Sequence, residues 1–344
     1  MSIPIFLIDK LNNIYGNDIS KEIIDGFSSD RNVTLRVNTL KANKVEIENE
    51  LLKNGISFCD VPWYDNAFVI ENLPGKSTSN LKSFNNLNNI NNETANIKNE
   101  NFKNKSIQNF KTNDFNECNS IENEIKKLDI YNEGKIYLQS LSSMIPPLVM
   151  DFEDNEDILD MCSAPGGKTC EMSCLNNNTN ITACELNSIR FERLKYNIEK
   201  QGANNVTLLN TDSRRINNLF KFDSILLDAP CSGSGTLTFK NDNKNFTELL
   251  IDKCVKSQKA LIDKAFRILK NGKTMVYSTC SILPEENEEI INYALEKYNF
   301  KIVPIKLNNF DESNLLKSSI DGTILVKPTN LYEGFFVAKL LKSN

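Results

Sequence analysis

The 344-residue chain contains no histidine. Histidine is the usual general base near neutral pH and the commonest metal ligand, so its absence excludes Ser-His-Asp and Cys-His hydrolase mechanisms. No run of about 18 apolar residues occurs, which excludes a membrane-spanning helix on length grounds. Pro4 and Asp9 interrupt the apolar opening stretch, and no basic leader or small-residue cleavage site surrounds it. We therefore expect a soluble intracellular protein without a secretory signal.

The nine cysteines include no CxxC pair, the spacing that is typical of zinc sites. Cys170 and Cys174 stand one helical turn apart and could be paired ligands. Two small side chains on the buried face of a helix fit that spacing better. We therefore expect no metal site and assign most cysteines to the core.

The net charge is −5, which is not the balance of a protein that grips a polyanion through a broad basic surface. Any contact with nucleic acid must therefore be local. A basic channel and an ordinary solvated surface explain the charge runs equally well. Acidic residues gather in 121–124, 151–160 and 284–289, and basic residues in 31–44, 190–200 and 253–273.

Composition divides the chain into three segments. Residues 76–125 are rich in Asn, Lys and Ser, with too few apolar side chains to bury, which predicts a disordered insertion. Residues 1–75 form a small α+β module before it. Residues 126–344 follow it as the larger domain.

In the first module, apolar alternation over residues 33–41 predicts a strand. Ile47 and Leu51 define one face of a helix over 44–54, which Gly55 ends. Two more short strands are predicted in ISFCDV and AFVIENL.

The larger domain alternates short β-rich runs with helical patterns. The β-rich runs include DILDMC, ITACEL, VTLLN, DSILLDAP and TMVYSTC. Near-regular alternation of strand and helix predicts a parallel sheet with helices on both faces. The fold class is therefore α/β, with a doubly wound, mainly parallel sheet.

A ligand site is predicted where DILDMCSAPGGKT turns from strand to helix. Pro165, Gly166 and Gly167 form the turn, and a helix then starts at Lys168. Such a turn lets a ligand approach the backbone, and the helix N-terminus favours a negative group. The spacing is neither GxGxxG nor GxxxxGK[ST], so the dinucleotide and P-loop interpretations lack their defining motif.

Three acids follow successive strands of the same domain. Glu185 ends the second strand, where a carboxylate can accept both hydroxyls of a ribose, and Asp212 and Asp228 follow the next two. A surface acid at a strand end is common, but three in series at the ligand-binding edge are harder to explain by chance.

Two cysteines also lie just beyond strands. Cys231 in DAPCSGSGT and Cys280 in YSTCSILPEENE each occupy a loop rather than a strand interior. The fourth and fifth strands are neighbours in doubly wound sheets, so we expect both thiols to face one pocket.

These motifs carry a specific resemblance. CSAPGGK, DAPCSGSG and STCSILPEENE resemble successive motifs of the Sun-type (Nop/Sun) family of S-adenosylmethionine-dependent RNA cytosine-5 methyltransferases. RVNTLK, YLQSLSSMIPPLV and GFFVAKL add support. The resemblance covers nearly the whole chain apart from the Asn-rich segment, and it implies the Rossmann-like fold of class I methyltransferases.

The resemblance implies roles for individual residues. Cys280 would attack the base, Cys231 would assist product release, and Asp228 and Lys168 would contact the cytosine and the cofactor region. S-adenosyl-L-methionine would be bound by Cys162, Ser163, Ala164, Pro165, Gly166, Gly167, Lys168, Glu185, Asp212 and Asp228. Ser163 and Glu185 depart from the alanine and aspartate common in the family, and neither change removes the expected interaction.

The chemistry requires such a nucleophile. Carbon 5 of cytosine must be activated by addition of a thiolate at carbon 6, and a cation such as Lys168 could lower the thiol pKa. Spacing alone does not rank the two cysteines, and Cys231 is a rival nucleophile because DNA cytosine methyltransferases use a Pro-Cys in that loop. Amino-directed methylation is disfavoured, because DAPC lacks the aromatic residue that would stack a base.

The expected partner is RNA, either ribosomal or transfer, bound by a monomer. The resemblance makes the first module the RNA-guiding element, with Arg31, Arg36 and Lys41 as candidate phosphate contacts. Solvated charges on a strand edge explain these three residues nearly as well. Trp63 and Tyr64 could stack on a base, although packing is the commoner role of such a pair. A ribosome-assembly factor with the same fold and no turnover is the alternative function. The compartment is left open between cytoplasm, nucleus or nucleolus, and an organelle.

Overall fold

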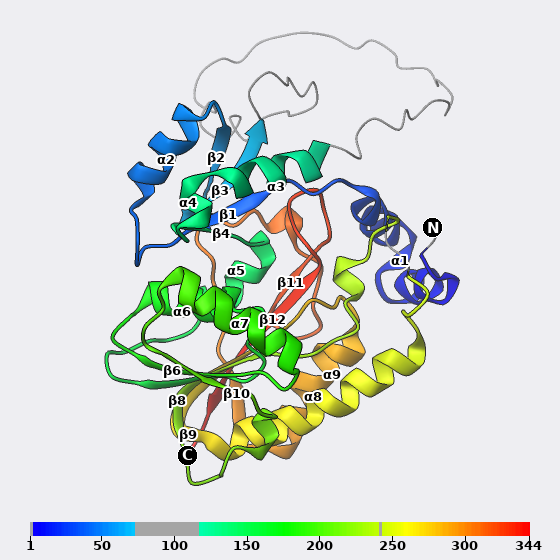
Figure 1. Ribbon diagram of the computed structural model, residues 1–344. Helices are drawn as coiled ribbons and strands as arrows, with labels where there is room; N and C mark the ends of the chain where they lie inside the picture. The colour runs from blue at the N-terminus through cyan, green and yellow to red at the C-terminus, as the bar shows by residue number, and fades with distance from the viewer. Residues whose placement is uncertain (1–2, 73–116, 241–242) are drawn as a thin grey trace, which may run out of the picture.

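The computed structural model describes residues 3–72, 117–240 and 243–344, which build two β-sheets (Figure 1). The smaller sheet is antiparallel, with strand order β2-β3-β1-β4. Its strands are β1 (Thr34–Val37), β2 (Ser57–Val61), β3 (Tyr64–Asn72) and β4 (Ile136–Leu138). The three strands predicted in the first module are confirmed.

Helix α2 (Lys44–Lys53) confirms the helix predicted after the first strand. The Asn43 side chain caps it by accepting from the backbone N–H of Glu46. Ile47 and Leu51 are fully buried against the smaller sheet. The chain leaves the helix through Gly55 at φ +69°, a conformation that favours glycine.

Helices α3 (Glu117–Lys127) and α4 (Asp129–Asn132) precede β4. Helix α3 occupies the end of the segment 76–125, so the expected disorder does not extend to residues 117–125. These residues are ordered because α3 buries an apolar side chain: Ile125 is fully buried with Ile130 of α4 and Ile136 of β4 in the core of the smaller sheet. Residues 76–116 of that expected insertion lie outside the described residues.

The larger sheet has the order β10-β12-β9-β8-β5-β6-β7, with β11 paired to β12. The neighbouring strands from β9 to β7 along this path pair in parallel. Strand β12 pairs antiparallel with β9, with β10 and with β11. The predicted doubly wound, mainly parallel sheet is confirmed. Its strands are β5 (Asp157–Asp160), β6 (Asn180–Cys184), β7 (Val206–Leu209), β8 (Phe222–Asp228), β9 (Leu269–Thr279), β10 (Phe300–Ile302), β11 (Ile324–Val326) and β12 (Phe335–Lys342).

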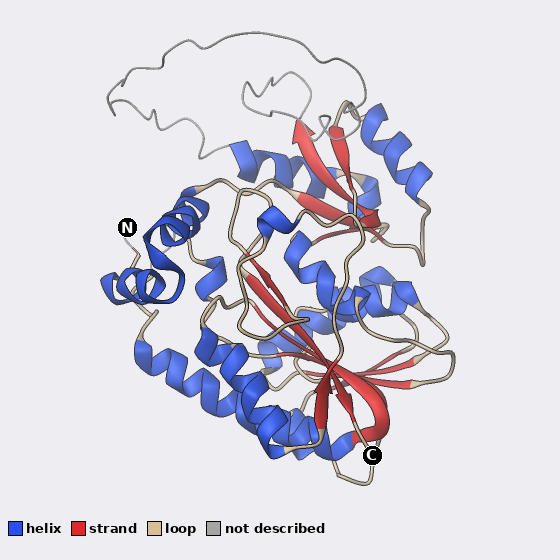
Figure 2. Cartoon of the chain, turned by 180° about the vertical axis from the view of Figure 1, so that it is seen from behind, coloured by secondary structure: helices blue, strands red, loops and turns tan. Residues whose placement is uncertain are grey.

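Helices cover both faces of the larger sheet, as Figure 2 shows. Alternate residues of β8 point to opposite sides: Ile225 and Leu227 join one buried cluster, and Leu226 joins the other. The main helices are α5 (Leu141–Leu148), α6 (Gly167–Leu175), α7 (Ser188–Gln201), α8 (Glu248–Ile268) and α9 (Glu288–Lys297). Short 3₁₀ turns are η3 (Ser213–Arg215), η4 (Ser234–Thr236), η5 (Pro284–Glu286) and η6 (Glu312–Asn314).

Helix α1 (Ile5–Ser28) opens the chain and bends at Gly16, whose φ is +77°. Its side chains Leu7, Leu11 and Phe27 belong to the same buried cluster as Ile225 and Leu227 of β8. This helix therefore packs on the larger domain, although it precedes the smaller sheet in sequence. Among the helices of the described segments, none is both long and apolar enough to cross a membrane.

Candidate active site

Strand β5 lies between β6 and β8. The chain continues from β5 through β6 and β7 on one side of it and then through β8 and β9 on the other, so the strand order reverses beside β5. Open α/β sheets bind ligands in the crevice at the carboxyl ends of such strands. The turn between β5 and α6 contains Gly166 at φ +109°, so a side chain there would be strained. A Cβ on Gly167 would approach Cε1 of Tyr137 to 3.0 Å. The glycine pair thus lets the turn lie close against its neighbours.

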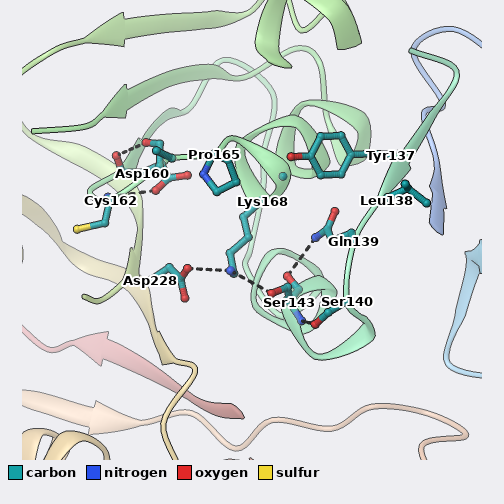
Figure 3. A pocket seen from close by; sticks show the side chains of 13 residues that line it. Tyr137, Leu138, Gln139, Ser140, Ser143, Asp160, Cys162, Pro165, Lys168 and Asp228 are labelled. Carbon is teal, nitrogen blue, oxygen red and sulfur yellow. Dashed lines mark hydrogen bonds and ion pairs between the residues drawn. The ribbon is translucent and has the colours of Figure 1, made fainter. Parts of the chain in front are cut away.

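One cavity lies between this turn and the segment before α5 (Figure 3). Its central contact joins Lys168 Nζ to Asp228 Oδ2 at 2.7 Å, and Ser143 Oγ lies 3.5 Å from the same nitrogen. Ser278 Oγ donates to the other oxygen of Asp228 at 2.8 Å. The carboxylate is therefore fixed from both sides before any ligand binds.

The charge of Lys168 is retained in this cavity. Burial lowers the pKa of Lys168. The carboxylate of Asp228 and the sulfur of Cys280 together raise that pKa by a larger amount, so the net shift is upward. The ammonium also lies 5.2 Å from the ring centre of Phe335. A fixed positive charge therefore stands close to the sulfur of Cys280.

The two loop cysteines meet, as the adjacency of their strands predicts. Their Sγ atoms lie 3.1 Å apart, within hydrogen-bond distance for sulfur. The hydrogen bond to Cys280, burial, and the nearby charges of Cys280 and Glu286 raise the pKa of Cys231 well above its usual range. The Cys231 thiol is therefore expected to keep its proton near neutral pH.

A second cavity of about 510 Å³ adjoins the first and shares Cys162 with it. That volume is in the usual range for small-molecule sites. Glu185 and Asp212 line it from the ends of β6 and β7. Asp212 accepts 2.6 to 3.0 Å bonds from the guanidinium of Arg214, which lowers the pKa of the carboxyl group.

The predicted cofactor residues divide between two adjoining cavities, except Gly166, which lines neither. Glu185 and Asp212 lie in the second. The first is lined by Cys162, Ser163, Ala164, Pro165, Gly167, Lys168 and Asp228, together with Tyr137, Gln139, Ser140 and Ser143. Cys231 and Cys280 lie beside Asp228 and Lys168 on the loops after β8 and β9.

Sequence reasoning missed Asp160 at the end of β5. Its carboxyl group accepts from Thr169 Oγ1 at 2.7 Å, and burial raises its pKa to about 6. The signal was present, because Asp160 ends a strand just as the other three acids follow theirs. Arg190 was also missed; it donates to the Ala164 carbonyl at 2.7 Å and lies 3.4 Å from Glu185.

The expectation that Arg36 contacts an RNA phosphate is wrong. The Arg36 side chain is fully buried, and its Nε lies 3.3 Å from Gln139 Oε1 and 3.9 Å from Glu171 Oε2. Arg31 is paired with Glu333 at 3.2 Å, and the Lys41 ammonium donates to two backbone carbonyls. Those two cations have structural contacts that the sequence did not reveal.

The aromatic pair and the cysteines have structural contacts too. Trp63 Nε1 donates to the hydroxyl of Tyr332 at 2.9 Å, and Tyr64 is buried. Cys170 and Cys184 are fully buried, but the other six cysteines that the structure describes with their side chains are only partly buried, so the assignment of most cysteines to the core is wrong. Within the described segments, no cluster of three or more potential ligands could hold a metal ion.

Comparison with known protein families gives two matches. Residues 147–341 match the family described as 16S rRNA methyltransferase RsmB/F. Residues 3–74 match a ferredoxin-like domain described as RsmF/B-like. Together the two matches include every predicted site residue and most of both sheets, but not β4 of the smaller sheet.

The chain is also similar to curated proteins. Ribosomal RNA small subunit methyltransferase F of Shewanella piezotolerans is 38% identical over 220 residues, which cover 61% of this chain and 46% of that protein. The human 28S rRNA (cytosine(4447)-C(5))-methyltransferase is 29% identical over 98% of this chain and 37% of its own length. The chain spans about half the length of the first of these relatives.

Two crystal structures from Pyrococcus horikoshii share the fold. A methyltransferase homolog protein is 28% identical, with a TM-score of 0.73 over 99% of this chain and 100% of that one. NSun6 with SFG, an analogue of S-adenosylmethionine, has a TM-score of 0.76 at 21% identity, covering 99% and 98% of the two chains. Both likenesses extend over the two sheets.

Proposed function

The chain belongs to the family of 16S rRNA methyltransferases RsmB/F, and from that premise we propose that it methylates carbon 5 of a cytosine in ribosomal RNA. One observation carries the proposal: two thiols stand 3.1 Å apart beside a fixed Lys168–Asp228 pair. Transfer to an amino group or to a hydroxyl needs no thiol, whereas transfer to carbon 5 does. The curated relatives named above support ribosomal RNA as the substrate class.

The two cavities fit S-adenosylmethionine, which when bound supplies an electrophilic methyl group. Glu185 and Asp212 offer carboxylates at the ends of adjacent strands, where such acids accept ribose hydroxyls. Arg214 keeps Asp212 ionised and hence an acceptor. The N-terminus of α6, behind the glycine turn, favours a carboxylate.

The charges around the sulfurs favour Cys280 as the nucleophile. The pKa of Lys168 is lowered by burial and raised by Asp228 and, to a smaller extent, by the sulfur of Cys280, so the ammonium and that sulfur attract each other. That attraction stabilises a thiolate at Cys280. Cys231 instead faces Cys280 and the carboxylate of Glu286, which keep its proton in place.

The proposed reaction has three steps: attack of the thiolate on carbon 6, methylation of carbon 5, and elimination of the thiolate. The Cys280 thiolate forms a bond to carbon 6, and the electron pair displaced from the 5,6 double bond makes carbon 5 nucleophilic. After the methyl group joins carbon 5, a water molecule takes the carbon 5 proton, and the electron pair of that C–H bond restores the 5,6 double bond as the carbon 6–sulfur bond breaks. The carbon 6–sulfur bond breaks with its electrons on Cys280, and the S–H of Cys231 donates a hydrogen bond to the departing thiolate.

The test uses the full chain and ribosomal RNA from cells that lack it, with radiolabelled methyl donor. We expect the wild-type protein to form 5-methylcytosine at a defined position, mapped by bisulfite sequencing. Cys280→Ala should form neither product nor adduct. Cys231→Ala should accumulate a covalent protein–RNA complex that survives denaturing electrophoresis, because release of the thiolate is slowed.

Cys59→Ala is the matched control, because that thiol lies in β2 of the smaller sheet and bonds to Glu71. It should leave methylation and adduct level unchanged. Equal methylation by the Cys280 and Cys231 variants would contradict the proposal. An unchanged map of 5-methylcytosine in cells without the protein would favour an assembly factor without turnover.

A further inference from the structure

The loop that carries Cys231 is anchored to the buried carboxylate of Glu286. Glu286 Oε1 accepts from the backbone N–H of Ser232 at 2.7 Å, and Oε2 accepts from the Ser232 hydroxyl at 2.5 Å. The Glu286 side chain lies in the turn η5 and is fully buried. Both oxygens therefore hold the residue directly after the thiol.

Helix α8 completes this anchor. The amide nitrogen of Gln258 donates to the carbonyl of Pro230 at 2.9 Å and lies 3.4 Å from Glu286 Oε1. Gln258 is fully buried as well. The Tyr277 hydroxyl donates to the backbone carbonyl of Glu286 at 2.6 Å. The residues on both sides of Cys231 are thus fixed by one carboxylate and one amide.

The two thiols consequently face opposite charges. Cys280 interacts with the ammonium of Lys168, whereas Cys231 interacts with the carboxylate of Glu286. A negative charge beside a thiol opposes its ionisation, and a positive charge favours it. The arrangement places a cation beside one sulfur and a carboxylate beside the other, although the two sulfurs lie only 3.1 Å apart.

We propose that Glu286 is a positioning residue that keeps the proton on Cys231 and aims its thiol at Cys280. The role in methylation rests on the proposed function, in which Cys280 must leave carbon 6 as a thiolate. A protonated Cys231, held in line, can donate to that sulfur. Without the carboxylate, Cys231 would share the thiolate and lose its ability to donate.

The titratable groups around Cys231 come from four neighbouring elements. Burial raises the pKa of Cys254 to about 11, and Glu286 adds to that shift. The pKa of Tyr277 is raised well above its usual range by burial first and then by Cys231. Both groups stay protonated near neutral pH. The titratable groups that interact with the Cys231 thiol are Cys280, Glu286 and Tyr277, and Cys254 interacts with Glu286.

The first experiment needs no RNA. Iodoacetamide reacts with thiolates, so the initial alkylation rates of Cys231 and Cys280 report their ionisation and can be followed by peptide mass spectrometry from pH 6 to 10. We expect Cys280 to react first in the wild-type protein. Glu286→Gln retains the shape but loses the charge, and should raise the Cys231 rate at pH 8 by about threefold to tenfold, since one pKa unit is a factor of ten.

Two acidic variants are the controls. Glu289→Gln removes the same charge from an exposed position in the same segment and should leave both rates unchanged. Glu286→Asp keeps the charge and should hold the Cys231 rate near the wild-type value. If Glu286→Gln does not fold, Ser232→Ala is the second variant: it keeps the carboxylate but removes a donor that offsets its charge, so it should lower the Cys231 rate below the wild-type value.

A folded Glu286→Gln protein with an unchanged Cys231 rate would overturn the proposal, as would a wild-type protein in which Cys231 reacts before Cys280. The second readout is the lifetime of the RNA adduct, which should lengthen in Glu286→Gln as it does in Cys231→Ala. A shifted alkylation rate without methylation by any variant would reject the proposed function and leave the role of Glu286 in place.

Discussion

Arg36 and Glu171 form a buried ion pair between the smaller sheet and α6, with Nε and Oε2 3.9 Å apart and both side chains fully buried. Burial raises the pKa of Glu171 to about 8, so the carboxyl group is ionised at pH 9; Arg36→Met then leaves that buried charge without its counterpart and should lower the free energy of unfolding by about 3 to 5 kcal/mol. The double replacement Arg36→Met, Glu171→Met should recover most of that loss, because neither charge is left. Urea unfolding followed by circular dichroism measures both.

Lys127→Met is the control, because Lys127 and its partner Glu124 both keep about half or more of their side chains in solvent. Exposed pairs contribute about 0 to 1 kcal/mol, so a small change is expected there. A loss at Arg36 no larger than at Lys127 would contradict the structural role of the buried pair.

The same residue shows where sequence reasoning stops. Alternation of Val33, Leu35 and Val37 predicts the strand, and it places Arg36 on the solvent side. In the structure β1 is covered on that side too, by the segment containing Gln139 and by α6, so the arginine is buried. Alternation within one strand carries no information about what covers its second face.

At the scale of elements, the two cysteine loops could be placed together because they follow neighbouring parallel strands. That inference needs only strand order, which alternation of strands and helices supplies. The contact between Glu286 and Ser232 joins a 3₁₀ turn to a loop 54 positions earlier. Glu286 lies in an acidic run, and the sequence alone does not distinguish a buried glutamate in such a run from its solvent-exposed neighbours.

The loops are also joined at a close crossing of two glycines. Gly235 N donates to the Cys280 carbonyl at 3.0 Å, and Gly334 N donates to the Gly235 carbonyl at 2.9 Å. A Cβ on Gly334 would lie 2.5 Å from Ile282 Cγ2 and 2.7 Å from Gly235 Cα. Gly334→Ala should therefore force the loops apart, lower the melting temperature and slow the alkylation of Cys280.

Gly272→Ala provides the comparison for that variant. Its φ is +73°, with nothing within 4 Å of the added carbon, so it should cost only the backbone strain of about 1 to 2 kcal/mol. It should not change the alkylation of Cys280. An equal effect of both variants on the thiol would show that the glycine crossing does not position it.

At the scale of the whole molecule, segments from the first part of the chain pack against the larger domain. Helix α1 contributes to the core of the larger sheet, and Arg36 ties the smaller sheet to α6. β4 returns to the smaller sheet after residue 126, where the sequence places the start of the larger domain. Composition found the Asn-rich segment, but it could not show that the chain crosses back between sheets.

Two deletions of similar length should therefore behave differently. Removing residues 3–28 strips Leu7, Leu11 and Phe27 from the core, and each large apolar side chain buried there contributes about 1.5 to 3 kcal/mol. That protein should aggregate or unfold without a cooperative transition. Replacing residues 79–112 by a short Gly-Ser linker removes a segment whose composition predicts no core, so the melting temperature and methylation should be retained. Calorimetry of the two variants decides the matter: a stable, cooperative protein without residues 3–28 would mean that α1 is an accessory to the larger domain rather than part of its core.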